Sequence, residues 1–262
     1  MKTLKTIFIL FVVACAAISC TKTITPVLPD NGTQLVIEGV VSDTTGPYHV
    51  NISKTVNFYA DNVDPSVSGA TVTITDVTSG ITDNLSETSA GVYTTHTIVG
   101  AYGHLYRMTA FVNGKTYTAT STMPQLVKID SVSFDYSDKK QIRPVAWYQD
   151  PAQFTNYYKY SLTVNDVRLK RFSTFEDRLS NGRYIRDKAD VDTMEIKNHN
   201  VVKFSLVGID VGAYTFLSEA ADVAYNNSSL AAPATPVSNI SGGCVGYFSA
   251  QTVSSATGTA SY

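Results

Sequence analysis

The chain has 262 residues, of which 44% are hydrophobic and 16% are charged, and its 20 basic and 22 acidic residues leave a net charge of −2. This near balance excludes the strongly basic surface that is typical of nucleic-acid-binding proteins. The length is sufficient for one large or two small domains with ordinary hydrophobic cores.

Residues 1–19 have the pattern of a bacterial secretion signal. Two lysines precede a 12-residue apolar run at 7–18, which is too short to span a bilayer as a helix. The three residues before Cys20 resemble a bacterial lipobox, in which the cysteine is lipidated and becomes the first residue of the mature protein. Cys15 also fits, but its use would leave a very short apolar core. Plain secretion without a lipid is the third alternative.

We therefore expect a signal peptide over 1–19 and a lipidated tether over 20–34, with Cys20 as the anchor. Several acyl chains on one cysteine hold a protein at a membrane, because each buried methylene contributes about 0.8 kcal/mol. Cleavage removes Cys15, so Cys244 is the only cysteine left with a free thiol. No disulfide can then form within one mature chain.

Short segments with two-residue alternation begin at Leu35. They are rich in Val, Thr, Ile and Tyr, and they lie at 35–42, 48–56, 70–78, 91–98, 106–112 and 115–123. Asn113-Gly114 between the last two predicts a β-hairpin, since a type I′ turn requires positive φ at both central residues. Strands of this length and spacing predict an immunoglobulin-like β-sandwich over 35–123.

The remaining residues, 124–262, predict a second β-rich domain with a single helix. Further strands are expected at 127–137, 144–151, 156–167, 201–210 and 245–255. A helix is expected near 213–226, where apolar residues recur at helical spacing and Asp210 can cap the first turn. The charged segment 168–195 predicts a long loop or an irregular hairpin. The expected fold class is mainly β, with two sandwich-like domains.

A series of phrases runs in a characteristic order through most of residues 20–250, including LVIEGVVSD, VSGATVTITD, WYQDPAQFTNYYKYSL, VKFSLVGIDVGAYTFL and NISGGCVGYFSA. Together they resemble a lipoprotein family of the phylum Bacteroidota, domain of unknown function 4249. The resemblance implies an outer-membrane lipoprotein whose gene often lies beside that of a TonB-dependent receptor, and it implies no reaction. Cys244 departs from the pattern, where a small aliphatic residue is expected, but cysteine can pack as a small hydrophobic side chain.

A glycine-rich stretch near the C-terminus suggests a phosphate-binding loop at first sight. Its glycines are Gly242, Gly243 and Gly246. A nucleotide loop is disfavoured because no Lys or Arg follows Lys203 and because a β-type aromatic run stands where a helix should begin. We interpret the glycines as structural, allowing close backbone approach so that Tyr247 and Phe248 anchor the last strand in the second domain.

Other patterns give no catalytic residue, metal site or cofactor. Ser137-x-x-Lys140 matches a nucleophile pattern but ends a strand. The histidines lack metal-binding spacing; they are His49, His96, His104 and His199. Acidic residues that could bind Ca²⁺ are better explained as solvated loop charges, and they are Asp61, Asp64, Asp187, Asp190 and Asp192.

Two groups of residues are candidates for an interface or a ligand site. The aromatic group contains Trp147, Tyr148, Tyr157 and Tyr158, with Tyr160 beside them. Its members can form core, a protein interface or a glycan platform. The basic group contains Arg168, Lys170 and Arg171. It is either a solvated strand edge or a surface for an acidic partner.

We expect a non-catalytic, lipid-anchored protein of the outer membrane that acts as an accessory or binding component and partners a TonB-dependent transporter. The alternative is an independent lipoprotein that captures a glycan or peptide, and a surface hydrolase is the third hypothesis. The residues after Cys20, TKTITP, lack the acidic residues common in surface-exported lipoproteins of this phylum. The sequence therefore leaves open which side of the membrane the protein faces.

Overall fold

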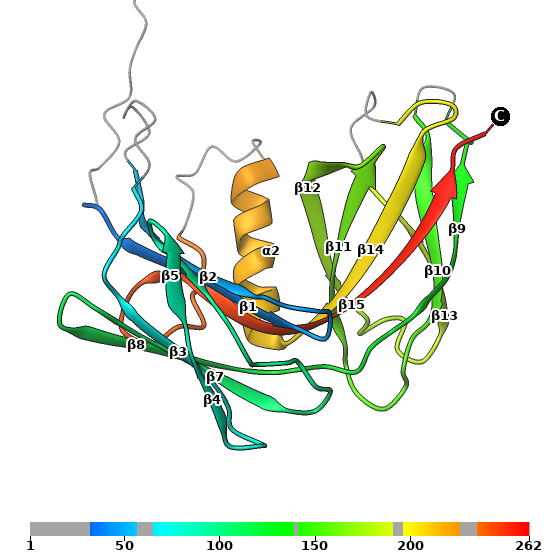
Figure 1. Cartoon of the computed structure of the whole chain (residues 1–262). Coiled ribbons are helices and arrows are strands. Elements are labelled where there is room, and N and C mark those ends of the chain that lie inside the picture. The colour runs from blue at the N-terminus through cyan, green and yellow to red at the C-terminus, as the bar shows by residue number, and fades with distance from the viewer. Residues whose placement is uncertain (1–31, 57–64, 139–140, 191–195, 226–234, 262) are drawn as a thin grey trace, which may run out of the picture. The chain divides into compact units, whose positions relative to one another are not determined.

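The computed structural model describes residues 32–56, 65–138, 141–190, 196–225 and 235–261. The chain from Thr33 onward groups into one unit (Figure 1). The expected signal peptide, both Cys15 and Cys20, and most of the tether lie outside the described residues.

The fold is mainly β, as the alternating pattern predicts, and its largest element is an eight-stranded sheet. In sheet order its strands are β12 (Val167–Glu176), β11 (Tyr157–Val164), β14 (Val201–Ile209), β15 (Val245–Thr259), β1 (Leu35–Ser42), β2 (His49–Lys54), β6 (Val92–Thr94) and β5 (Ser86–Ser89). β1 pairs in parallel with β15, whereas the other neighbours pair antiparallel. The first and last described strands therefore lie side by side in the middle of the sheet.

Two smaller sheets pack against the large one. The first contains β4 (Ile81–Asn84), β3 (Thr71–Asp76), β7 (Leu105–Val112) and β8 (Lys115–Thr122), and the second contains β13 (Tyr184–Lys188), β10 (Arg143–Gln149) and β9 (Ile129–Asp135). Phe248 lies opposite Gly39, and Leu206 lies opposite Ser254. Two-residue alternation then turns Phe248 and Leu206 to the same face of the large sheet, the core face. Phe248 joins the core with β3, β7 and β8, and Leu206 joins the core with β10. This layering confirms the mainly β class and the sandwich-like packing of the sheets.

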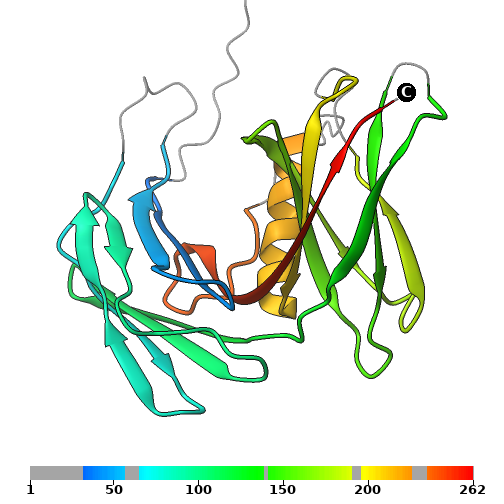
Figure 2. The ribbon, with the colours of Figure 1, turned by 45° about the vertical axis from the view of Figure 1, so that its right-hand side comes forward.

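The helix α2 (Val211–Tyr225) packs on the opposite face of the large sheet, the helix face. Its Phe216 belongs to an apolar cluster with Val207 of β14 and Val253 of β15. These two strand residues alternate with neighbours on the core face, which explains why one sheet can bury both sides. Its neighbours in the large sheet are β12, β15 and β11, and Figure 2 shows α2 against this half of the sheet.

Two local signals in the sequence correspond to observed geometry. Oδ1 of Asp210 accepts a hydrogen bond from the backbone N–H of Ala213 at 2.9 Å, so Asp210 caps α2. Asn113 and Gly114 both have positive φ, at 51° and 80°, between β7 and β8. The predicted hairpin is confirmed.

The expectation of a long loop or hairpin over 168–195 is wrong, because this segment contains most of β12 and all of β13, which lie in different sheets. β12 is an edge strand, and its Leu169 and Phe175 contact the second core while Phe172 contacts the α2 cluster. Charged residues between them hide the alternation, as is usual at a solvated edge. The four-residue strands β4 and β5 are also absent from the predicted set.

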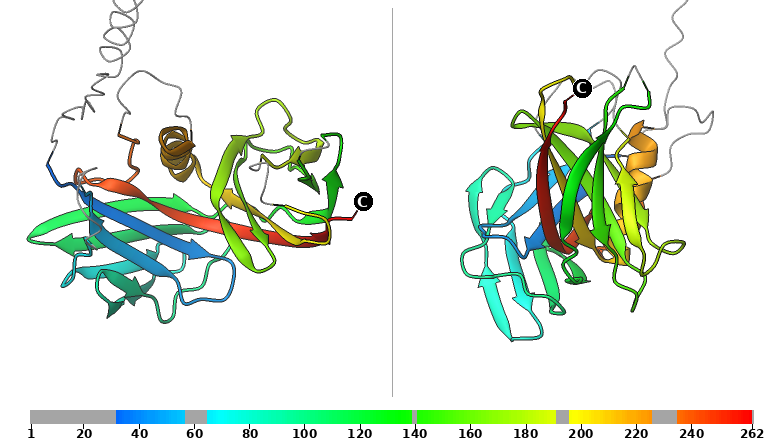
Figure 3. Two further views of the ribbon diagram at one scale, coloured as in Figure 1. Left: turned by 90° about the horizontal axis from the view of Figure 1, so that it is seen from above. Right: turned by 90° about the vertical axis from the view of Figure 1, so that its right-hand side faces the viewer.

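β15 runs from one half of the structure to the other (Figures 1 and 3). Phe248 and Ala250 belong to the first core, whereas residues 252–259 pair with β14. A boundary at residue 123 stays a prediction, but the last strand contributes to both halves. The interpretation that Phe248 anchors this strand in the second domain is wrong, because the alternation directs its side chain into the first core.

Candidate functional site

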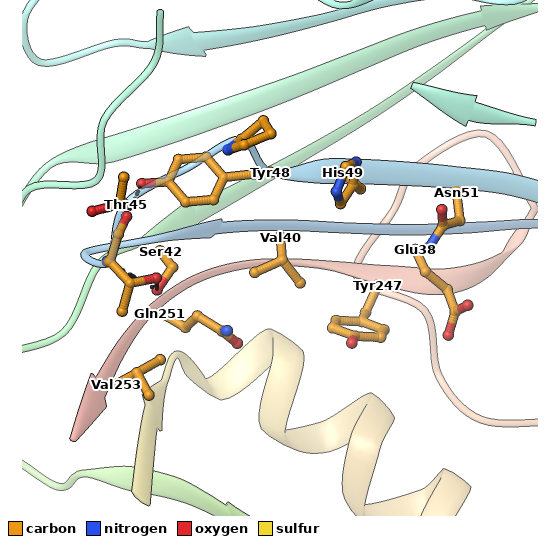
Figure 4. A pocket seen from close by; sticks show the side chains of 12 residues that line it. Glu38, Val40, Ser42, Thr45, Tyr48, His49, Asn51, Tyr247, Gln251 and Val253 are labelled. Carbon is orange, nitrogen blue, oxygen red and sulfur yellow. Dashed lines mark hydrogen bonds between the residues drawn. The ribbon is translucent and has the colours of Figure 1, made fainter. Parts of the chain in front are cut away.

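A hollow of about 430 Å³, the β1–β15 hollow, lies where β1, β2 and β15 adjoin (Figure 4). Its lining consists of Glu38, Val40, Ser42, Thr44, Thr45, Pro47, Tyr48, His49, Asn51, Tyr247, Gln251 and Val253. Small-molecule sites usually have volumes of about 300–1,000 Å³, so the hollow is large enough for a small ligand.

The floor of the hollow follows from strand register. β1 turns its odd-numbered residues to the core and its even-numbered residues to the hollow, which therefore lies on the helix face. Glu38 lies between Tyr247 of β15 and Asn51 of β2, and Ser42 lies beside Gln251. A rise of about 3.3 Å per residue places these two polar rows about 13 Å apart.

Four polar side chains of the floor have hydrogen-bonding capacity that the described residues do not use. Oε1 of Gln251 is buried and has no hydrogen-bond partner among the described residues. The side chains of Glu38, Asn51 and Tyr247 likewise make no hydrogen bond within the described part of the chain. Because buried polar groups in proteins are normally paired, this concentration of unused capacity indicates a binding surface.

The Glu38 carboxyl reaches solvent, yet the surrounding walls desolvate it. This burial raises the pKa of Glu38, and the nearby positive charge of Lys159 partly offsets the effect. Burial also lowers the pKa of Lys159 to about 8, and the charge of Arg168 acts in the same direction. Burial, with the charge of Glu38, raises the pKa of Tyr247 to about 12. The Tyr247 hydroxyl therefore keeps its proton at neutral pH and can donate a hydrogen bond.

Aromatic side chains at both ends of the hollow are held in place. The Tyr48 hydroxyl donates to the backbone carbonyl of Thr44 at 2.5 Å. The Tyr247 ring stacks on Phe216 of α2 with ring centroids 5.4 Å apart, and Figure 4 shows it on the side of the hollow next to α2. Fixed side chains lose little rotamer entropy when a ligand binds, so the hollow is preorganised at these two points.

The aromatic candidates from the sequence separate into different environments. Tyr148 and Tyr158 are fully buried in the second core. Of the three roles considered for them, both are therefore core residues, and neither is accessible to a partner or ligand. Tyr160 is also in that core. Tyr157 contacts the α2 cluster on the helix face. Only Trp147 lies on an outer face, where its ring stacks on Tyr184 at 6.2 Å between centroids.

The basic candidates lie on β12, the edge strand. Arg168 and Lys170 are exposed. Arg171 is half-buried, forms an ion pair with Asp190 at 2.9 Å and lies over the Tyr225 ring at 5.4 Å from its centroid. Two of the three cations are therefore accessible to an acidic partner, and the third is engaged within the chain.

The glycine stretch before and at the start of β15 has a structural role: it allows backbone conformations and close contacts that other residues cannot adopt. Gly242, Gly243 and Gly246 all have positive φ. A Cβ on Gly242 would come within 2.7 Å of Tyr117, and one on Gly246 would collide with the carbonyl oxygen of Ile37. Gly246 thus allows β15 to lie close against β1. Cys244 is buried in the first core, where it packs as a small hydrophobic residue.

The acidic residues considered for Ca²⁺ do not form a site in the described part of the chain. Asp190 is engaged by an arginine of β12, and Oδ2 of Asp187 is buried without a partner. Asp61, Asp64 and Asp192 lie outside the described residues. Across the described ranges, no group of three or more His, Cys, Asp or Glu side chains is placed to hold a metal ion.

Sequence reasoning missed Glu38, Asn51 and Gln251, and it treated Tyr247 as purely structural. The available signal is a lone glutamate in the otherwise apolar strand LVIEGVVS. Alternation places that glutamate on the face opposite the core, where a charged residue in a central strand is unusual. Its partner on β15 could not be found this way, because parallel pairing of Glu38 with Tyr247, far apart in the sequence, leaves no local pattern.

The fold and the hollow define a mainly β protein with two sandwich-like packings and a polar surface site on the shared sheet. The chain belongs to the family described as Domain of unknown function (DUF4249), whose model matches residues 21–257. No curated protein matches it. Among solved structures, the chicken interferon gamma receptor alpha chain is similar over 68% of this chain and 89% of that one, with 8% identity and a TM-score of 0.22. No helix among the described residues is both long and apolar enough to cross a membrane.

Proposed function

We propose that the protein is a non-catalytic, lipid-anchored component of the outer membrane that binds a ligand or partner at the cell envelope. The observation that carries this proposal is the β1–β15 hollow, four of whose polar side chains make no hydrogen bond among the described residues. The lipobox before Cys20 supports the anchor. The family resemblance supports an accessory role beside a TonB-dependent transporter.

The partner is tested by affinity isolation of the tagged full-length protein from detergent-solubilised membranes, followed by mass spectrometry. We expect a TonB-dependent transporter to be recovered. The double variant Arg168→Glu/Lys170→Glu reverses the two exposed charges of β12 and should reduce recovery severalfold. Arg107→Glu, an exposed residue of β7, is the control and should leave recovery unchanged. Repeated isolation without a transporter would reject the partnership.

The anchor is tested by metabolic labelling with a palmitate analogue. Cys20→Ser should remove the label and release the protein from the membrane fraction, because no other acyl-bearing cysteine remains. Cys15→Ser should stay labelled. Equal labelling of Cys20→Ser and the unmodified protein would reject the lipid anchor at this position.

The second candidate function is independent capture of a glycan or peptide, and Trp147 favours it. Its half-buried ring lies beside Tyr184, with the guanidinium of Arg186 5.6 Å from the ring centroid. Such an aromatic and cationic face suits stacking with a ligand. Trp147→Ala should abolish binding on a glycan or peptide array, and binding that survives this substitution would exclude the face.

A further inference from the structure

The β1–β15 hollow has acceptors that lack donors. Oε1 of Gln251 is buried without a partner, and the Glu38 carboxyl has none among the described residues. An unsatisfied buried acceptor is unfavourable, so a ligand donor that reaches Gln251 on binding restores a hydrogen bond that the unbound protein lacks.

The hollow also offers donors next to these acceptors. Tyr247 and Asn51 flank Glu38 in the same row across three strands. The phenol and the amide can each donate, while the carboxylate beside them only accepts. A ligand hydroxyl fits this row of donors beside an acceptor, because it can donate a hydrogen bond to the carboxylate and accept one from the phenol or the amide.

Apolar atoms separate the two polar rows. Val40 lies between the two rows on β1, and Val253 lies beyond Gln251 at the far end of the hollow (Figure 4). A ligand must therefore present C–H surface between its polar groups. This arrangement suits an extended molecule that carries several hydroxyls, not a uniformly polar or uniformly apolar one.

The charges of the lining disfavour other ligand classes. Glu38 is the only carboxylate among the lining residues, and no Lys or Arg lines the hollow, so an anion finds no counter-charge. A cation would find Glu38, but the charge of Lys159 already acts on that carboxyl. The remaining polar lining groups are hydroxyls, amides and one imidazole.

We propose that the β1–β15 hollow binds a neutral, hydroxyl-rich molecule of the saccharide class, held by Glu38 and Tyr247 at one end and by Gln251 at the other. This inference rests on the proposed binding function and assigns it a ligand class. The site is separate from the Trp147 face, which lies on β10 in the other half of the structure.

The test uses the full chain, purified in detergent, on an array of neutral oligosaccharides. Calorimetric titration of the best binder is compared with titration of putrescine and of citrate. We expect saccharide binding that falls at least tenfold in Glu38→Gln and in Gln251→Leu. Asp166→Asn makes the same carboxylate-to-amide change in the exposed β11–β12 turn and should bind normally. Circular dichroism and thermal midpoints establish that each variant is folded.

The possible outcomes separate this inference from the proposed function. A blank array with folded protein, or preferential binding of putrescine or citrate, overturns the ligand class. Saccharide binding that both variants retain overturns the site. If Glu38→Gln abolishes transporter recovery while the array stays blank, the binding function stands and the saccharide inference fails. If no transporter is recovered but the variants lose saccharide binding, the inference stands and the partnership fails.

Discussion

At the scale of single residues, the pKa of a buried carboxyl is raised by burial and lowered by the hydrogen bonds that it accepts. In Asp83 the hydrogen bonds dominate. Burial alone would raise the pKa of Asp83, but hydrogen bonds from the backbone N–H groups of Thr97, Ile98 and His96 outweigh it and lower the pKa to about 2. Oδ2 of Asp83 accepts these bonds at 2.6–2.9 Å. The charged carboxylate therefore fixes the chain between β6 and β7.

Asp83→Asn should destabilise the protein by about 2 kcal/mol at pH 7, the equivalent of the lowered pKa. In the unmodified protein this contribution is present above pH 4 and is lost as the pH falls toward 2, because the native state resists protonation. Urea unfolding at pH 7 and pH 3 measures the difference. The substitution should reduce the loss of stability between the two pH values. An unchanged pH dependence would contradict the assignment.

Asp187 shows the opposite case. Burial raises its pKa to about 6, and its Oδ2 has no hydrogen-bond partner among the described residues. Since the folded state holds the proton more tightly than the unfolded state, ionisation destabilises the fold as the pH rises from about 4 to 6. Asp187→Asn should stabilise the protein by about 1–3 kcal/mol at pH 7 and have little effect at pH 4. Urea unfolding at both pH values tests this, and destabilisation at pH 7 would refute it.

At the scale of elements, the sequence predicts features that depend on nearby residues. These are the alternating segments of the first sandwich, the Asn113-Gly114 hairpin and the Asp210 cap. β12 was not, since its apolar residues are shared between two faces and separated by charges. The parallel contact of β1 with β15 was not predictable either, although Gly246 marks it. The hollow forms where β1 and β15 adjoin, so local sequence patterns could not predict which residues line it.

Gly246→Ala tests the contact between β1 and β15. The residue has φ of +126°, and a Cβ would collide with the Ile37 carbonyl oxygen. We expect destabilisation of about 3 kcal/mol or more, from backbone strain together with displacement of β1. Gly80→Ala is the matched control, since Gly80 also has positive φ but open space around it, and it should cost only about 1 kcal/mol. Equal effects on the urea midpoint would show that close approach is unimportant.

At the scale of the whole molecule, β15 connects the two cores. Phe248 is fully buried in the first, and Ala260, just beyond the end of β15, is fully buried in the second. A strand that contributes to both should make their unfolding cooperative, because separating either half exposes part of the other. The chain has one tryptophan, Trp147, and it lies in the second half, where it reports on that half alone.

Phe248→Ala removes a large side chain from the first core and should cost about 3–5 kcal/mol. If the halves unfold together, the Trp147 fluorescence transition shifts to lower urea by the same amount as the far-ultraviolet circular dichroism transition. Ile240→Val, a milder change in the same core, should shift both by a smaller, equal amount. An unmoved fluorescence midpoint would establish two independent domains with a boundary near residue 123.

The parallel pairing of β1 with β15 also has a consequence for biogenesis. β1 cannot acquire one of its two neighbours until residues 245–251 have been synthesised, since these residues supply its parallel partner. Contacts that join such distant parts of a chain form slowly. Closure of the central sheet is thus deferred until residues 245–251 have left the ribosome, long after both strands of the β1–β2 hairpin are available.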